Sequence, residues 1–528
     1  MAPDFDLLII GGGINGVGIA RDAAGRGLSV CLAEMNDLGS ATSGASTKLF
    51  HGGLRYLEYF EFRLVREALM EREVLLRAMP HISWPMRFVL PYHHEMRFDS
   101  ETPTSKLLSY VMPWMKGRRP AWLIRLGLFI YDNLGGRDLL PATTSMRLQG
   151  RSEGAPLKPE FQKAYEYSDC WVEDSRLVVL NARDAEAKGA SIRPRTKVTS
   201  ATVEDGIWRV SVNDRVANET YDITAKMVVN AAGPWVGDVL RGTLKSNQQG
   251  GVRLVRGSHI VTRKLFDHDK SYFFQGIDGR IIFAIPYETD FTLIGTTDSD
   301  HADADERPQI TEAEQSYLIE FINQYLAKSI SEEDVVWTYS GVRPLYDDGA
   351  KSATATTREY VLNLDKSRGA AALHIFGGKI TTYRKLAEAA LEKVAGVFPQ
   401  IDEAWTAGVA LPGGDFPVDG FDALVDALQA EFMYLNERWA KRLVRAYGTE
   451  ARDILGDAVT RDDLGADFGS DLTQREVEWL IHKEYARTAD DVLWRRSKLG
   501  LRLREAQIQK LDNWMADYLR NSFPAAAE

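Results

Sequence analysis

The chain has 528 residues, 45% of them hydrophobic, and a net charge of -11. This length suggests about two to four domains with a sizeable core. The acidic balance argues against nucleic-acid binding, and no apolar run approaches the roughly 20 residues that would cross a bilayer.

Residues 6 to 34 are typical of a nucleotide-binding βαβ unit. An apolar run at 7–10, as in a buried parallel strand, leads into a G-x-G-x-x-G turn and a helix, and a second strand ends at an acid. The helix N-terminus presents free N–H groups to a pyrophosphate, and the acid can accept hydrogen bonds from a ribose. The expected contacts of a dinucleotide, FAD or NAD, are Gly11, Gly13, Ile14, Asn15, Gly16 and Glu34.

Three later segments favour FAD over NAD. The loop at 36–58 is dense in Gly, Ser and Thr, and residues 227–236 form a second buried strand that ends at Gly-Pro. Residues 375–390 run from a strand through Gly-Gly into a helix, whose N-terminus would stabilise charge on a reduced flavin. The residues expected to bind the flavin half are Thr42, Ser43, Ser46, Thr47, Lys48, Leu49, His51, Gly52, Gly53, Ala232, Gly233, Gly377, Gly378, Lys379, Thr381 and Thr382.

The order of these segments predicts an α/β protein with a discontinuous, Rossmann-like, doubly wound FAD-binding domain made of residues 1–90, 170–235 and 340–395. Alternating segments at 207–212, 259–263, 280–285 and 291–295 predict an antiparallel-sheet substrate or cap domain, which takes 91–169 and 236–339. Residues 396–528 are expected to form a C-terminal helical domain, with a capping box at Thr473 and Glu476.

Motifs along most of the chain, from residue 6 to about 505, resemble one family. They are GGGINGVGIARDAAGRG, TKLFHGGLRYLE, EFRLVREALMEREVL, YSDCW, GSHIV, IGTTD, VWTYSGVRPL and FGGKITTYRKLAE. The sequence is similar to the bacterial FAD-dependent glycerol-3-phosphate dehydrogenases of aerobic respiration. This resemblance implies FAD as the cofactor, glycerol 3-phosphate as the substrate and a membrane quinone, ubiquinone or menaquinone, as the electron acceptor.

Binding of a phosphoester dianion requires Arg, Lys or backbone N–H donors. The candidates are Arg55, Arg343, Lys379 and Arg384, although Arg384 lies inside a helix, where a surface ion pair is the better prediction. The resemblance implies a pocket lined by Arg55, Tyr56, His259, Arg343 and Lys379. Oxidation of a secondary alcohol also needs a proton acceptor, for which His259 and His51 are the candidates.

Three other functions fit the same residues. In an FAD oxidase of amino or hydroxy acids, Arg343 would bind a carboxylate, and an oxygen-using glycerol-3-phosphate oxidase would differ only in the electron acceptor. A flavin-carrying membrane scaffold would bind FAD and lipid without turnover. We expect no metal site, because His93 and His94 are adjacent and no third ligand is evident.

Residues 102–131 interleave aromatic and aliphatic side chains with Lys106, Lys116, Arg118, Arg119 and Arg125, and contain no acid. This composition fits docking to an anionic membrane surface and equally a cap segment with a solvated basic face. The resemblance favours docking, hence a cytoplasmic protein attached peripherally to the inner face of the plasma membrane. A homodimer is left open, and Cys31 and Cys170 are expected to be buried thiols.

A second basic cluster, at 495–504, is expected to be a solvated or interdomain face.

Overall fold

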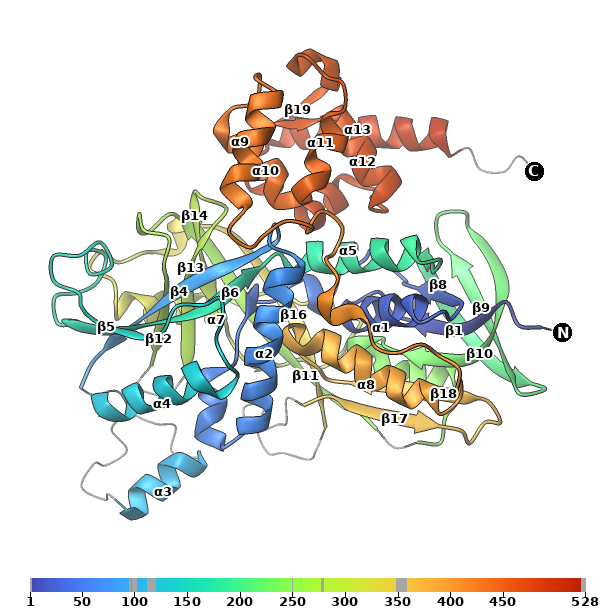
Figure 1. Cartoon of the computed structure of the whole chain (residues 1–528), viewed down its shortest axis with the longest axis horizontal. Coiled ribbons are helices and arrows are strands. Elements are labelled where there is room, and N and C mark those ends of the chain that lie inside the picture. The colour runs from blue at the N-terminus through green and yellow to red at the C-terminus, as the bar shows by residue number, and fades with distance from the viewer. Residues whose placement is uncertain are drawn as a thin grey trace.

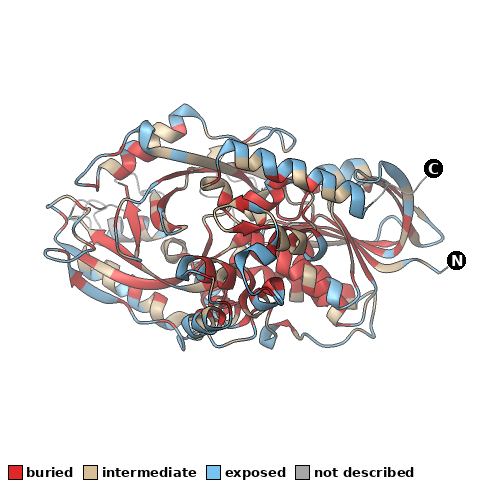
Figure 2. Ribbon diagram, turned by 90° about the horizontal axis from the view of Figure 1, so that it is seen from above, coloured by how far each residue is buried: buried red, intermediate tan, exposed pale blue. Residues whose placement is uncertain are grey.

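The computed structural model describes residues 2–94, 96, 102–111, 120–248, 250–276, 280–347 and 359–523. Two sheets lie side by side, and a helical C-terminal domain sits across them (Figure 1). Both sheets are buried, whereas exposed residues line the outer faces of the helices (Figure 2). The mixed α/β architecture with a C-terminal helical domain confirms the expected fold class.

The first sheet is the nucleotide-binding sheet. Its described strands, in the order β17-β18-β10-β1-β2-β7 with β8 and β9 attached, are β17 (Val361–Asp365), β18 (Ala371–Phe376), β10 (Glu219–Asn230), β1 (Phe5–Ile10), β2 (Val30–Ala33), β7 (Ser191–Arg193), β8 (Thr196–Glu204) and β9 (Ile207–Asp214). The strands from β18 to β7 are parallel. Helices α1 (Ile14–Gly25), α5 (Asp174–Ala187) and α8 (Tyr383–Ala395) pack together against this sheet.

The first βαβ unit forms as its sequence predicts. Leu7, Leu8 and Ile9 are fully buried, as a parallel strand covered on both faces requires. Gly16 allows α1 to start close to the end of β1, since a Cβ there would lie 1.9 Å from the Gly11 carbonyl oxygen. The parallel strand β10 brings the segment at 227–236 beside β1, where its end meets the glycine turn.

The second sheet takes strands from the ranges expected in the substrate domain and also residues 49–50, 83–90 and 340–346 from the ranges expected in the FAD-binding domain. Its described strands are β3 (Leu49–Phe50), β4 (Ser83–Tyr92), β5 (Thr144–Arg147), β6 (Lys163–Val172), β11 (Val252–Arg263), β12 (Ser271–Gln275), β13 (Ile281–Tyr287), β14 (Phe291–Gly295), β15 (Ser299–Asp300) and β16 (Val335–Tyr346). Helix α7 (Glu312–Asn323) packs on it, and α2 (Phe62–Ala78) lies between the sheets.

Strand pairing corrects one expectation about the cap. The segment 207–212 is part of β9, which pairs with β8 and β10 in the nucleotide-binding sheet rather than in the cap sheet. Alternation predicted the strand itself, but the pattern carries no information on which sheet will take it. The other three predicted strands, within β11, β13 and β14, are neighbours in the second sheet.

The C-terminal domain has a core of its own around Trp439, Leu443 and Tyr447. Its elements are α9 (Phe421–Glu431), α10 (Glu437–Tyr447), α11 (Ala451–Leu455), β19 (Asp467–Gly469), β20 (Leu472–Thr473), α12 (Gln474–Lys483), η11 (Asp491–Arg496), η12 (Leu499–Leu501) and α13 (Glu505–Ser522). The expected capping box at Thr473 is absent from α12. Glu476 instead accepts hydrogen bonds from Arg442 and from the Tyr447 hydroxyl, a buried ion pair that outcompetes a cap.

A buried ion network holds this domain to the nucleotide-binding sheet. Asp37, 4% exposed, accepts hydrogen bonds from Arg495 Nε at 2.5 Å and from Arg496 Nη1 at 2.5 Å. Arg502 donates to Asp290 at 2.8 Å at the end of the second sheet. The basic cluster at 495–504 therefore lies at an interdomain face.

Replacing Asp37 with Ala is expected to destabilise the folded protein by about 3–5 kcal/mol, because the buried Arg496 and the partly buried Arg495 lose the carboxylate that they share. Thermal unfolding followed by circular dichroism measures the effect. Asp457→Ala is the matched control, since that side chain is 96% exposed and also pairs with an arginine. Equal unfolding temperatures of the two variants would contradict the assignment.

One surface is unusually apolar. Helices α3 (Pro103–Val111) and α4 (Ala121–Leu134) both contact the turn η2 (Leu54–Tyr59), and they form one end of the molecule (Figure 1). The exposed large apolar side chains here, which we call the apolar face, are Phe60, Phe62, Leu107, Tyr110, Val111, Trp122, Leu126 and Phe129. Of the basic segment, Trp114, Lys116, Arg118 and Arg119 lie outside the described residues. Within the described ranges, no helix is both long and apolar enough to span a bilayer.

Candidate active site

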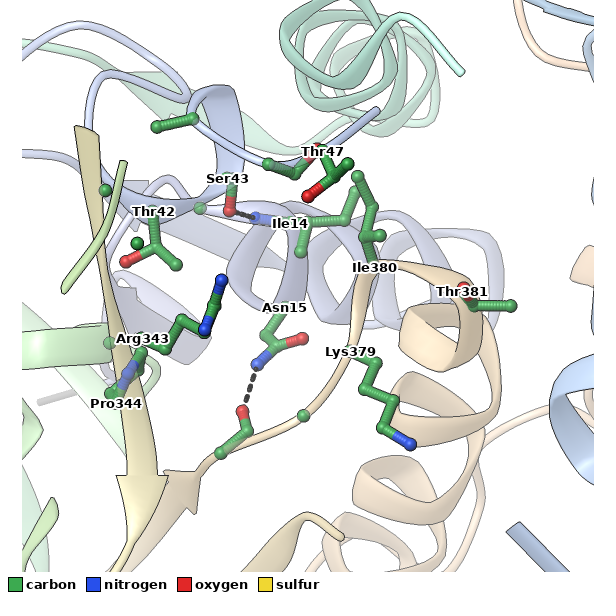
Figure 3. A pocket seen from close by; sticks show the side chains of 18 of the residues that line it. Ile14, Asn15, Thr42, Ser43, Thr47, Arg343, Pro344, Lys379, Ile380 and Thr381 are labelled. Carbon is green, nitrogen blue, oxygen red and sulfur yellow. Dashed lines mark hydrogen bonds between the residues drawn. The ribbon is translucent and has the colours of Figure 1, made fainter. Parts of the chain in front are cut away.

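The N-terminus of α1 opens into a pocket between the two sheets (Figure 3). Gly13 caps the helix without a side-chain hydrogen bond, and the Ile14 N–H donates to Ser43 Oγ at 2.9 Å. Glu34 accepts hydrogen bonds from the N–H groups of Gly12 and Asn36 at 2.6 and 2.7 Å. These contacts hold the glycine turn and the loop after β2 together at the edge where a dinucleotide is expected.

The pocket gathers most of the predicted site residues. Those that line it are Gly13, Ile14, Asn15, Thr42, Ser43, Ser46, Thr47, Leu49, His51, Tyr56, Gly233, His259, Arg343, Gly377, Gly378, Lys379 and Thr381. They come from six separate stretches of chain. The parallel strands β1, β10 and β18 end side by side in the first sheet, while His259 and Arg343 come from β11 and β16 of the second sheet. Asn15 Nδ2 donates to the Gly377 carbonyl at 3.1 Å and joins the first and last stretches.

The remaining predicted residues, Gly11, Gly16, Glu34, Lys48, Gly52, Gly53, Arg55, Ala232 and Thr382, lie behind or beside the lining. Lys48 is 1% exposed, and its ammonium donates to Asp174 at 2.6 Å, so it serves a buried ion pair rather than the pocket surface. Arg384 is also buried and pairs with Glu71, which confirms the ion-pair prediction but places the pair inside the protein.

Arg343 reaches into the pocket from β16. Its guanidinium is ion-paired with Asp298 and donates to Thr296 Oγ1 at 3.2 Å. Gly257, which pairs with Gly341 across β11 and β16, leaves room for this side chain, since a Cβ at Gly257 would lie 2.5 Å from Arg343 Nη2. Because a guanidinium carries five N–H donors, an anion can bind it while Asp298 stays in contact.

His259 lies in the wall beside Arg343. Its Nε2 is 3.0 Å from Thr47 Oγ1, and its ring stacks on Tyr339 with centroids 4.6 Å apart. Burial, with Arg343 and Lys48 nearby, holds the pKa of His259 well below its ordinary value. The ring is therefore neutral at neutral pH and retains a lone pair that can accept a proton.

His259 should make the folded state sensitive to acid. Its folded-state pKa lies below its unfolded value near 6.5, so only the unfolded chain gains a proton there as pH falls below that value. The native protein is expected to lose about 1.4 kcal/mol per pH unit from this group, and His259→Asn should remove that part of the slope. Unfolding temperatures of both proteins across this range measure it, and parallel slopes would contradict it.

The pocket selects against positive charge. Lys379 lies opposite Arg343, and its ammonium sits 3.9 Å from the centre of the Tyr56 ring (Figure 3). Among the described residues, the lining includes these two cations and two histidines but no carboxylate. An anionic substrate is favoured there on electrostatic grounds.

Comparisons with known proteins agree with this geometry. A family model described as FAD dependent oxidoreductase matches residues 6–384, and one described as C-terminal domain of alpha-glycerophosphate oxidase matches residues 404–522. The chain belongs to the FAD-dependent oxidoreductases, in the group that contains the bacterial aerobic glycerol-3-phosphate dehydrogenases.

The relatives of this FAD-dependent oxidoreductase are matched almost end to end. A D-erythritol 1-phosphate dehydrogenase from Brucella abortus is 46% identical, covering 96% of this chain and 97% of the relative. An aerobic glycerol-3-phosphate dehydrogenase from Escherichia coli is 44% identical over 99% of both chains. The solved glycerol-3-phosphate dehydrogenase from Bacillus halodurans complexed with FAD aligns with a TM-score of 0.71 at 25% identity, covering 99% of this chain and 96% of that one.

The residues of the oxidoreductase fit its cofactor. Asn15 Oδ1 is buried beside the glycine turn without a hydrogen bond to any described residue, and the uncapped start of α1 leaves N–H donors for a pyrophosphate. FAD is therefore the cofactor, as the sequence predicts.

Sequence reasoning missed part of the lining: Ala45, Ala231, Gly257, Gly341, Pro344, Leu345, Ile375 and Ile380. Gly257 and Gly341 lie two residues before His259 and Arg343, so both belong to motifs already identified in the sequence. Their role depends on their pairing across two strands, which neither motif reveals.

Proposed function

We propose that the protein oxidises sn-glycerol 3-phosphate to dihydroxyacetone phosphate. The main support for this proposal is that Arg343, Lys379 and His259 line one pocket, which also contains the start of α1. Bound FAD would supply the acceptor for the hydride of the substrate carbon. The names of the relatives that are 44–45% identical support the same substrate.

The side chains divide the task by charge. Arg343 binds the phosphate dianion through a charge-assisted fork, and Lys379 supplies a second positive charge across the pocket. His259, held neutral by burial, accepts the proton of the secondary hydroxyl, with Thr47 orienting its ring. His51, which also lines the pocket, is the alternative proton acceptor, and Tyr56 supports the substrate side. Arg55, which is outside the lining, stays a predicted substrate ligand.

D-Erythritol 1-phosphate is a second candidate substrate, because a relative named for its oxidation is 46% identical over nearly the whole chain. It presents the same phosphate and an adjacent hydroxyl on a longer carbon chain. An oxidase of amino acids is less favoured, since the described lining offers no carboxylate to an ammonium group. A hydroxy acid carries no ammonium group, and turnover of lactate tests that alternative.

Steady-state turnover with an artificial quinone separates these possibilities. The proposal predicts that kcat/KM for glycerol 3-phosphate exceeds that for D-erythritol 1-phosphate, with no turnover of glycerol, lactate or D-alanine. A higher kcat/KM for D-erythritol 1-phosphate would identify that ester as the better substrate. Turnover of D-alanine would overturn the phosphate assignment itself.

We further propose that the apolar face docks the enzyme peripherally on the inner face of the plasma membrane, where a quinone, ubiquinone or menaquinone, takes up the electrons. The face combines exposed Trp122, Leu126 and Phe129 with the cations Lys106 and Arg125. Apolar side chains mixed with cations suit the surface of an anionic bilayer.

Replacing Trp122, Leu126 and Phe129 together with Glu should weaken binding to liposomes that contain phosphatidylglycerol by at least tenfold. Full burial of each such side chain contributes about 1.5–3 kcal/mol, so even partial insertion of three exceeds the roughly 1.4 kcal/mol of a tenfold change. Co-sedimentation measures the binding. Met433→Glu with Val459→Glu is the control, because both residues are exposed far from this face, in the C-terminal domain. An equal loss of liposome binding in both variants would show that the apolar face does not dock on the membrane.

A further inference from the structure

A second, larger cavity lies between the second sheet and the C-terminal domain, away from the proposed active site. Its volume is about 1020 Å³, within the range of small-molecule sites. Its walls come from β4, the start of α5, the turn between β13 and β14, helix α10 and the segment from Arg495 to Arg502. In Figure 1 this region lies where the C-terminal domain meets the top of β4 and β14.

Many cations line this cavity, and most are already neutralised. Arg176 pairs with Glu484, Arg442 with Glu476, and Arg496 with Asp37, each through buried carboxylates. Arg502 donates to Asp290, and Lys441 pairs with Glu437. These pairs hold the domains together and leave little charge for a ligand.

Arg445 is different. Its guanidinium lies between two aromatic rings, 4.0 Å from the centre of Trp84 and 3.6 Å from that of Phe421. Its Nη1 is buried with no hydrogen-bond partner, and no carboxylate of the described chain lies within ion-pair distance of it. Burial lowers the pKa of Arg445 to about 10, which still leaves it charged at neutral pH. A partly buried, positively charged guanidinium is thus left with one buried nitrogen, Nη1, that has no hydrogen-bond partner among the described residues.

Lys498 supplies a second such charge. It is 5% exposed, and its ammonium donates to the carbonyl oxygen of Trp494 without an ion pair to any described carboxylate. Burial, together with Lys48, lowers the pKa of Lys498 to about 8. Asp174, which is already paired with Lys48, opposes this charge most, and Glu173 comes next, with a pKa that burial raises to about 7.

We propose that this cavity binds a small phosphate-bearing anion, with Arg445 and Lys498 as its ligands. A phosphate dianion matches two separate cations, and its oxygens can satisfy the unpaired Nη1. Arg438 and Lys441 also line the cavity from α10, but they are paired with Asp290 and Glu437, so Arg445 and Lys498 are the two cations of the described lining left for an anion. The site goes beyond the proposed reaction, because the cavity and the active-site pocket have no lining residue in common.

Calorimetric titration of pyrophosphate into the full-length, FAD-loaded protein tests the proposal, at ionic strength held constant with KCl. Three variants are compared with the native chain: Arg445→Met, Lys498→Met and Arg343→Ala, each checked for native circular dichroism. Arg452→Met is the matched control, because that arginine lies on α11 outside the cavity and pairs with Glu431.

We expect the native protein, Arg343→Ala and Arg452→Met to bind pyrophosphate at this site. Arg445→Met and Lys498→Met should each bind it at least tenfold more weakly. Repetition with inorganic phosphate distinguishes a requirement for a single phosphate from one for a longer polyanion. No binding to the native protein would overturn the proposal. Loss of all binding in Arg343→Ala would also overturn it, because pyrophosphate would then bind only in the active-site pocket. Native affinity in both Arg445→Met and Lys498→Met would overturn it for the same reason.

Discussion

Arg343→Ala is expected to lower kcat/KM for glycerol 3-phosphate by about 10²- to 10⁴-fold while the protein keeps its FAD. Each charge-assisted hydrogen bond contributes about 1.5–3 kcal/mol, and a guanidinium fork makes two of them to a phosphate. The side chain reaches the pocket from β16, whereas the residues expected to hold the dinucleotide come mainly from the α1 turn and the following loop. Turnover and the absorbance of bound flavin are measured on the same preparation.

Arg343→Lys should fall between the native protein and Arg343→Ala, since it keeps the charge but loses the fork. Arg253→Ala is the matched control: Arg253 is another arginine of the second sheet, pairs with Asp300 and does not line the pocket. Loss of FAD from Arg343→Ala would show that Arg343 binds the cofactor, and would overturn its assignment as a substrate ligand.

Gly16→Ala should yield protein that retains FAD poorly, with an affinity lowered by roughly 100-fold or more. The added Cβ would lie 1.9 Å from the Gly11 carbonyl oxygen, so either the turn or the start of α1 must move. Overpacking costs about 1–3 kcal/mol where neighbouring side chains can yield, and here the neighbour is backbone, so the upper value applies. About 3 kcal/mol corresponds to a roughly 100-fold change in affinity.

The ratio of flavin to protein absorbance after gel filtration, and titration of the apoprotein with FAD, measure this effect. Gly127→Ala provides the control, because a Cβ at Gly127 in α4 would meet no atom within 4 Å. Full flavin content in Gly16→Ala would show that the turn accommodates the methyl group, contrary to the close approach seen between α1 and β1.

The nucleotide-binding unit could be predicted from sequence because its determinants are local. The apolar run of β1, the glycines and Glu34 follow one another within residues 6–34, and the contact between Glu34 and the glycine turn is made within this one stretch. The same holds for β18 and the Gly-Gly turn before α8. Strand partnership is not local, which is why β9 was expected in the wrong sheet and the pairing of Gly257 with Gly341 went unseen.

The chemistry of individual cations was harder to foresee. Lys48 lies in a loop rich in cofactor-binding side chains, yet the fold turns it toward Asp174, which is 126 residues away in sequence. Arg445 and Lys498 could not be predicted as a pair, because they line one cavity only when α10 and the segment after η11 come together beside β4. A charged residue's partner is set by tertiary structure, so sequence can suggest its type of role but not its target.

The most direct test of the central claim is an anaerobic absorbance spectrum of the purified protein before and after addition of glycerol 3-phosphate, with lactate and D-alanine as controls. We predict that the flavin band bleaches with glycerol 3-phosphate and stays unchanged with the two acids. A yellow protein that fails to bleach with glycerol 3-phosphate would contradict the substrate assignment, while leaving the fold and the FAD site in place.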